Sequence, residues 1–342
     1  MGKRFAYVFV AWLFLCACGH KETVVRYVSL DFEAATVKSA LPFEDNLVKT
    51  LDLLVFRQDG QLEYARHEEN GASVKAKLQT GVPYTCFLLS NLPAGFFGED
   101  FMRADDMDAF HASISEALEH GFVMVGSTDC TFESAGKVTV EITHLSSKVQ
   151  LDGISAAFLQ NGLAKLKVSL DKVYLTNVAM DESLLSADTY TPQQWCNCMR
   201  LDPALPSSLR PLLLAESSLE IPDSRRVETP CTFYCAPNRF DTVQYDPETG
   251  RPLDDGVHVG NTPEWSPRNT RLVLEMTING IKNYYPVTLP ALKGGHCYRI
   301  KNLVLLGYGA EDPDKPVGRT RIAFSLEVQG WDYADWQEEE FE

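Results

Sequence analysis

Short stretches in which apolar and polar residues alternate recur along most of the chain. In residues 28–34 the apolar side chains Val28, Leu30 and Phe32 are separated by polar residues. A period of two predicts a β-strand with one buried face, because successive side chains point to opposite sides of a sheet. The pattern returns in residues 321–329. There, four apolar side chains alternate with smaller or polar ones: Ile322, Phe324, Leu326 and Val328.

Similar runs, bounded by turn residues such as Asp59-Gly60 and Asn279-Gly280, predict strands through most of the rest of the sequence. The predicted strands cover residues 51–56, 61–68, 74–78, 84–89, 122–125, 137–142, 147–151, 166–178, 232–235, 271–277, 283–289 and 297–305. Residues 181–228 lack such patterns and predict long loops, with short helices at most near 193–199 and 209–214.

One helix stands out between the strands. Asp105 and Asp106 can cap its start, and Gly121 can end it. The apolar residues between them share one helical face: Met107, Phe110, Ile114, Ala117 and Leu118.

Many short strands, frequent turns and little helix predict an all-β fold. The length and a change of pattern near residue 150 favour two tandem β-sandwich domains, with the one short helix in the first. We expect the domains to span residues 24–150 and 151–342, the second ending in an acidic tail.

The first residues are typical of an exported bacterial lipoprotein. Lys3 and Arg4 precede the apolar run 5–15, which suits a signal peptide and is too short to span a bilayer. Leu15 lies three residues before Cys18 and a small residue lies just before it, as a lipobox requires. We expect residues 1–17 to be removed, Cys18 to be lipidated and residues 18–23 to form a tether. The alternative is an ordinary signal peptide with an incidental cysteine.

Charge and cysteines limit the possible partners. The chain has 31 basic and 47 acidic residues, a net charge of −16, which argues against nucleic acid as a partner. Seven cysteines follow Cys18, an odd number with no repeated spacing. Most are expected to be small buried apolar residues, and Cys231 with Cys235 is the pair most compatible with a disulfide.

Motifs that would indicate an enzyme or a metal site are absent from the sequence. There is no His-Glu-x-x-His, no Gly-x-Ser-x-Gly and no P-loop. Cys196-x-Cys198 misses zinc spacing, and the acidic turn 311–314 does not match a calcium-binding loop. We therefore predict no catalytic residue, no metal and no cofactor. A hydrolase with paired carboxylates is a third alternative, since such a pair needs only spatial proximity.

Several short sequence segments, in their order along the chain, resemble those of the fimbrillin superfamily. This superfamily comprises the type V pilus subunits and anchors of the Bacteroidales. They are Leu51-Asp52-Leu53-Leu54-Val55-Phe56 with Asp59-Gly60, Leu88-Leu89-Ser90-Asn91, Leu145-Ser146-Ser147-Lys148-Val149, Thr232-Phe233-Tyr234-Cys235-Ala236-Pro237-Asn238 and Gly309-Ala310-Glu311-Asp312-Pro313-Asp314-Lys315-Pro316. The resemblance implies transthyretin-like β-sandwiches and a fimbrial subunit exported as a lipoprotein. It also implies that an arginine- or lysine-specific protease removes the first strand, and that a neighbour's C-terminal strand fills the groove.

In this sequence the resemblance places the first strand at residues 24–34. Its side chains Val28, Leu30 and Phe32 would fill the groove that a neighbour's strand later occupies. Lys38 is the candidate processing site, where the family usually has arginine. A solvated loop lysine is the alternative reading. The candidate donor region is 321–342, with Ile322, Phe324, Leu326 and Val328 on its strand and Tyr333 and Trp336 in its tail.

The resemblance leaves the position in the fimbria open. A shaft or tip subunit would lose residues 18–38, whereas an anchor would keep its lipid and first strand at the outer membrane. Expected partners are other fimbrial subunits, the outer membrane and surface ligands of host or bacteria. The competing hypothesis is a glycan- or host-ligand-binding surface lipoprotein outside any fimbria, with aromatic platforms drawn from Trp195, Trp265, Trp331 and Trp336.

Overall fold

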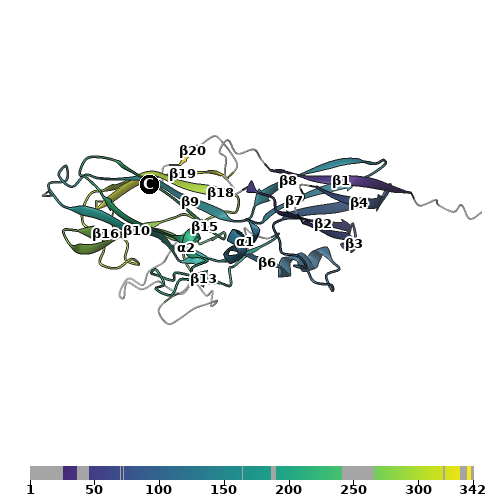
Figure 1. Cartoon of the computed structure of the whole chain (residues 1–342), viewed down its shortest axis with the longest axis horizontal. Helices are drawn as coiled ribbons and strands as arrows, with labels where there is room; N and C mark the ends of the chain where they lie inside the picture. Colours follow the sequence, from purple (N-terminus) through teal and green to yellow (C-terminus); the bar gives the residue numbers. More distant parts are fainter. Residues whose placement is uncertain are drawn as a thin grey trace, which may run out of the picture.

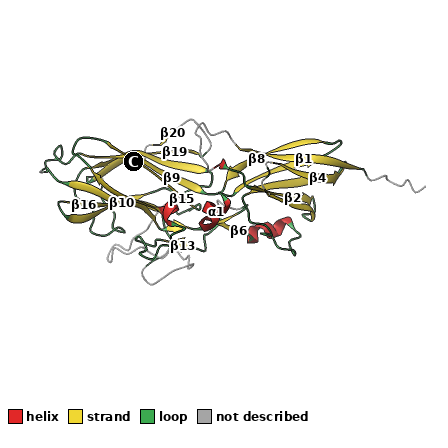
Figure 2. Ribbon diagram, viewed as in Figure 1, coloured by secondary structure: helices red, strands yellow, loops and turns green. Residues whose placement is uncertain are grey.

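The computed structural model describes residues 26–36, 46–69, 71, 73–163, 165–185, 190–240, 265, 267–318, 320–331 and 337–339. Strands dominate, and they form two β-sandwiches placed end to end along the long axis (Figures 1 and 2). The prediction of an all-β fold with tandem sandwiches is confirmed. No helix among these residues is long and apolar enough to cross a membrane.

The N-terminal sandwich is one folded-over sheet in the order β3-β2-β5-β7-β8-β1-β4. Its strands are β1 (Tyr27–Thr36), β2 (Thr50–Arg57), β3 (Leu62–Glu69), β4 (Ser73–Gln79), β5 (Pro83–Ser90), β7 (Met124–Thr131) and β8 (Gly136–His144). Strands β7 and β8 pair only at Met124↔His144 and Val125↔Thr143, so the sheet opens into two layers. Apolar side chains from both layers form the core: Leu30, Phe32, Leu51, Leu53, Val55, Val74, Ala76, Leu78, Tyr84, Cys86, Leu88, Met124, Val140 and Ile142.

The prediction of one continuous helix between Asp105 and Gly121 is wrong. The segment consists of η2 (Ala104–Ala109), β6 (His111–Ser113), η3 (Ile114–Glu116) and the four-residue α1 (Ala117–His120). Strand β6 pairs with β12 (Asp181–Ser183), and this pairing across the sandwiches holds the middle of the segment extended. Met107, Ile114 and Ala117 are buried as expected, but Leu118 is 48% exposed.

The C-terminal sandwich has two main sheets, in the orders β14-β10-β16-β17 and β15-β9-β18-β19-β20. Their strands are β9 (Ser147–Ala156), β10 (Val168–Thr176), β14 (Leu214–Glu220), β15 (Val227–Cys235), β16 (Arg271–Ile278), β17 (Ile281–Thr288), β18 (His296–Leu305), β19 (Ile322–Gly330) and β20 (Gln337–Glu339). Inward-facing side chains of both sheets form one large core.

Irregular segments cover one side of this sandwich. They contain the short pair β11 (Val178–Ala179) and β13 (Trp195–Cys196) and the four-residue helix α2 (Arg210–Leu213). The helix expected near 209–214 is therefore present, whereas residues 193–199 form no helix because β13 pairs with β11.

Cys231 and Cys235, the pair that the sequence makes most compatible with a disulfide, are not bonded to each other. Both residues lie on β15, four positions apart, opposite Leu151 and Ser147 of β9. Residues at that spacing on one strand are about 13 Å apart, which exceeds the ~7 Å limit for two bridged Cα atoms. Cys231 and Cys235 are both free thiols.

The chain passes from one sandwich to the other between β8 and β9. Only Leu145 and Ser146 separate the two strands. Since β9 pairs with β15 and β18 along its length, residues 147–150 belong with the second sandwich. We therefore propose that the domain division falls at residues 145–146 rather than after residue 150.

Candidate functional site

The first described strand, β1, lies between two strands that follow it in the sequence. It pairs antiparallel with β4, from Tyr27↔Gln79 to Glu33↔Ser73, and parallel with β8, from Leu30↔Gly136 to Thr36↔Ile142. Strand β1 therefore completes the layer β8-β1-β4, and its covalent link to the other strands of the sandwich runs through residues after Thr36.

The inward face of β1 fills the N-terminal core. Leu30 and Phe32 are almost completely buried, and Val28 is half-buried against the same cluster. The Phe32 and Phe132 rings meet edge to face with centroids 6.1 Å apart. Burial of a Leu or Phe side chain contributes about 1.5–3 kcal/mol to the free energy of folding. Leu30 and Phe32 therefore contribute much of the free energy that keeps β1 in the sandwich. Leu30 and Phe32 thus lie on the buried face that the alternating pattern of residues 28–34 predicts.

Removal of β1 would create a site with a defined chemistry. The facing edges of β4 and β8 would both expose unpaired backbone groups, and the positions of Leu30 and Phe32 would become apolar pockets. Such an edge recruits an extended strand with apolar side chains at alternate positions. An incoming strand that runs in the same direction as β1 would be parallel to β8 and antiparallel to β4.

The predicted donor residues on β19 are divided between core and surface. Ile322 and Leu326 are buried in the C-terminal core, Val328 is half-buried and Phe324 is 39% exposed. Phe324 breaks the expected alternation beside a register shift in β18, where Ile300↔Leu326 is followed by Leu303↔Phe324.

The described end of the chain is held less firmly than β19. Strand β19 pairs with β18 from Ile322↔Leu305 to Gly330↔His296, whereas β20 pairs with β19 at three residues, from Leu326↔Glu339 to Val328↔Gln337. The candidate residues Cys18, Lys38, Tyr333 and Trp336 lie outside the described residues.

Trp331 fixes the start of the tail at the junction of the two sandwiches. Its ring centroid lies 4.1 Å from that of His144, on β8 of the N-terminal sandwich, and 5.5 Å from that of Phe122, which precedes β7. It also stacks on Tyr234 of β15, with ring centroids 5.6 Å apart. The Lys148 ammonium lies 5.3 Å from the Trp331 centroid. Trp331 therefore holds the chain that follows β19 against both sandwiches.

The aromatic platform of the competing hypothesis is not formed by the described tryptophans. Trp331 and Trp265 are buried, and the Trp265 indole donates to Asn177 Oδ1 at 3.0 Å. Trp195 is half-buried against Trp265, with centroids 5.4 Å apart. These rings serve packing rather than exposed sugar binding.

A buried carboxyl also lies at the junction. Glu182 of β12 is almost fully buried, and Ser146 Oγ donates to its Oε1 at 3.1 Å. Burial raises the pKa of Glu182 to about 8, and the charge of Asp181 adds to the rise. Sequence reasoning missed this residue, because nothing in the irregular region 181–228 marks it as buried.

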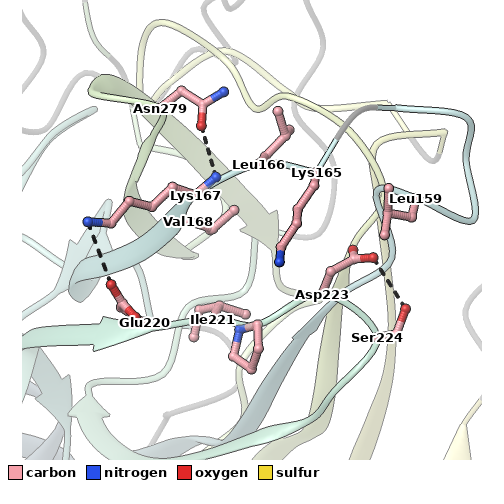
Figure 3. A pocket seen from close by; sticks show the side chains of 11 residues that line it. Leu159, Lys165, Leu166, Lys167, Val168, Glu220, Ile221, Asp223, Ser224 and Asn279 are labelled. Carbon is pink, nitrogen blue, oxygen red and sulfur yellow. Dashed lines mark hydrogen bonds and ion pairs between the residues drawn. The ribbon is translucent and has the colours of Figure 1, made fainter.

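A groove of about 1030 Å³ lies at the far end of the C-terminal sandwich (Figure 3). Aliphatic side chains and charged side chains of both signs line the groove. The Lys167 ammonium and the Glu220 carboxylate form an ion pair across it at 3.7 Å. Asn279 Oδ1 accepts from the Lys167 backbone at 2.8 Å. The groove contains no histidine or cysteine. Among the described residues, no three His, Cys, Asp or Glu side chains are grouped to hold a metal.

No family model and no curated protein matches the sequence. Solved structures do match over nearly the whole chain. A proposed cell adhesion protein from Parabacteroides distasonis aligns with TM-score 0.61 at 15% identity, covering 90% of this chain and 100% of that one.

Two fimbrial proteins of Porphyromonas gingivalis also align. A fimbrilin gives TM-score 0.57 at 13% identity, with 89% of this chain and 97% of that one covered. The tip fimbrial protein Mfa3, truncated at its C-terminus, gives 0.52 at 13%, with 90% and 100% covered. The sequence resemblance and the structural alignments agree, and the chain has the fold of the Bacteroidales fimbrillins.

Proposed function

We propose that this chain is a structural subunit of a surface fimbria and assembles by strand exchange at the position of β1. The observation that carries the proposal is the placement of β1 between β4 and β8, where its loss leaves two strand edges and an apolar core open. The fimbrilin and the tip fimbrial protein that share the fold support the same role. We further propose that the chain acts at the cell surface, with other fimbrial subunits as partners.

The C-terminal region is the proposed donor. Strand β19 has apolar residues with the same period of two as β1, at Ile322, Phe324, Leu326 and Val328. Its release would break its whole ladder with β18 and remove two side chains from the C-terminal core. Among the described residues, release of the chain beyond Trp331 breaks the three-residue β20 ladder. The segment beyond Trp331, with Tyr333 and Trp336 as anchors, is therefore proposed to leave first.

Two positions in the fimbria follow from two fates of β1. Cleavage after Lys38 would separate β1 from the sandwich and give a polymerising subunit. Retention of β1 with a lipid on Cys18 would give an outer-membrane anchor that closes the base of the polymer, the position that the absence of an arginine near Lys38 favours.

The test is the mass and N-terminal sequence of the protein from its native membrane, before and after Lys38→Gln. An acylated Cys18 start in both, in a protein that co-purifies with fimbriae, supports the anchor. A Ser39 start that Lys38→Gln abolishes, and the control Lys315→Gln leaves intact, supports the polymerising subunit. Lys315 is a suitable control because it is exposed. A chain that is acylated at Cys18 but never co-purifies with fimbriae would refute the proposal and favour the ligand-binding surface lipoprotein.

A further inference from the structure

Two thiols meet in the layer of the N-terminal sandwich that faces β1. Cys86 of β5 and Cys130 of β7 have their Sγ atoms 3.4 Å apart. Cys86 is fully buried, whereas Cys130 is half-buried at the edge of the same core. Strands β5 and β7 are neighbours whose register runs from Pro83↔Thr131 to Ser90↔Met124.

We propose that Cys86 and Cys130 are an oxidisable pair that forms a cross-strand disulfide between β5 and β7. The sulfur atoms must approach by roughly 1.4 Å to reach the ~2.05 Å of an S–S bond. The register places Tyr84 opposite Cys130 and Cys86 opposite Thr128, so the two cysteines are diagonal neighbours. A diagonal bridge requires a small shift of one strand, and we therefore expect a bond that reductants open more easily than a relaxed one.

The environment assigns different roles to the two thiols. A hydrogen bond from the Cys86 thiol lowers the pKa of Cys130, and that bond together with burial raises the pKa of Cys86. The half-buried Cys130 is therefore the attacking thiolate, because thiolates are the nucleophiles in disulfide exchange.

The oxidant is a disulfide from outside the molecule, such as a small-molecule or protein disulfide. The Cys130 thiolate attacks one of its sulfurs, forms a mixed disulfide and releases the first external thiolate. Cys86 Sγ then attacks Cys130 Sγ, its proton passes to the second departing thiolate, and the external thiol leaves. Two electrons and two protons pass from the cysteine pair to the external disulfide, which is reduced to two thiols.

The link would reinforce the layer that stays in place if β1 is removed. It joins strands that are already paired, so the topology is unchanged. The inference needs only the fold and is independent of the proposed function.

The experiment exposes the purified full-length chain to oxidised glutathione, quenches it in acid, alkylates free thiols and maps the tryptic peptides. Cys86 and Cys130 fall in adjacent peptides, 78–103 and 104–137, each with one cysteine. We expect these two peptides to be found linked, two hydrogen masses lighter than their sum, and separated after reduction.

Cys86→Ser should abolish the link and leave a glutathione adduct on Cys130, because no second thiol can resolve the mixed disulfide. Cys130→Ser should abolish the link and leave Cys86 alkylated, while Cys231→Ser, a half-buried cysteine on β15, should leave the link unchanged. Far-UV circular dichroism of each variant verifies the fold. Alkylation of both cysteines after exposure would overturn the proposal. So would a glutathione adduct that persists on Cys130 beside an alkylated Cys86.

Discussion

Replacement of Glu182 by Gln tests whether the carboxyl at the junction is protonated in the folded protein. Its Oε1 accepts a hydrogen bond from Ser146, and its Oε2 has no partner among the described residues. Burial raises its pKa from 4.5 to about 8. Between these two values the folded chain holds a proton that the unfolded chain has lost. The free energy of unfolding therefore falls as the pH rises from 4.5 to 8.

The size of the effect follows from the two pKa values. Each pH unit in this window corresponds to about 1.4 kcal/mol, so the wild-type chain loses roughly 3 kcal/mol by pH 7 and at most about 5 kcal/mol by pH 8. Glutamine keeps the shape of the protonated acid without this penalty. We therefore expect Glu182→Gln to stabilise the protein slightly or not at all at pH 5 and by a few kcal/mol at pH 8.

Urea unfolding at pH 5, 7 and 8, followed by circular dichroism, measures the difference. Other groups with raised pKa values, such as Asp52 at about 6, contribute to both chains and cancel in the comparison. Glu99→Gln, at an exposed position, is the matched control and should show no trend with pH. A Glu182→Gln effect that is equal at all three pH values would refute the reasoning.

Three further predictions concern packing. Phe32→Ala should lower the free energy of unfolding, measured in urea, by about 3–5 kcal/mol. The control Phe324→Ala, at an exposed position, should lower it by less than about 1 kcal/mol. Equal losses in the two variants would contradict the assigned role of β1. Gly126→Ala places a Cβ 1.9 Å from the Glu141 carbonyl oxygen, so we expect a drop of several degrees in melting temperature, and an unchanged value would disprove the close approach. Trp331→Ala should lower the free energy of unfolding by about 3–5 kcal/mol and should speed proteolysis of the tail. Limited digestion followed by mass spectrometry would detect the faster cleavage. An unchanged rate of digestion would argue against a fixed junction.

Alternation of apolar residues, together with short apolar runs bounded by turn residues, was sufficient to predict most strands of this fold. The six-residue run 51–56 falls within β2, and the alternating run 28–34 falls within β1 with Leu30 and Phe32 inside. A strand with one buried face leaves its period in the sequence, so such elements can be recognised without knowledge of their partners.

Elements that depend on distant partners could not be predicted in the same way. The run after residue 105 fits a helical period, yet the pairing of β6 with β12 extends its middle. Phe324 fits a buried face, yet a register shift in the neighbouring β18 accompanies its exposure. The 3.4 Å approach of Cys86 and Cys130 depends on the pairing of β5 with β7, which their separation in sequence does not reveal.

The near-continuity of β8 and β9 has a mechanical consequence. Residues 136–156 run from one sandwich into the other, and both strands are internal to their sheets. Each makes one parallel ladder, β8 with β1 and β9 with β18, and the strands follow the long axis of the molecule (Figure 1). Tension along that axis would load these hydrogen bonds in shear, many at once, instead of unzipping them singly. Residues 136–156 would then transmit force from one sandwich to the other with little extension.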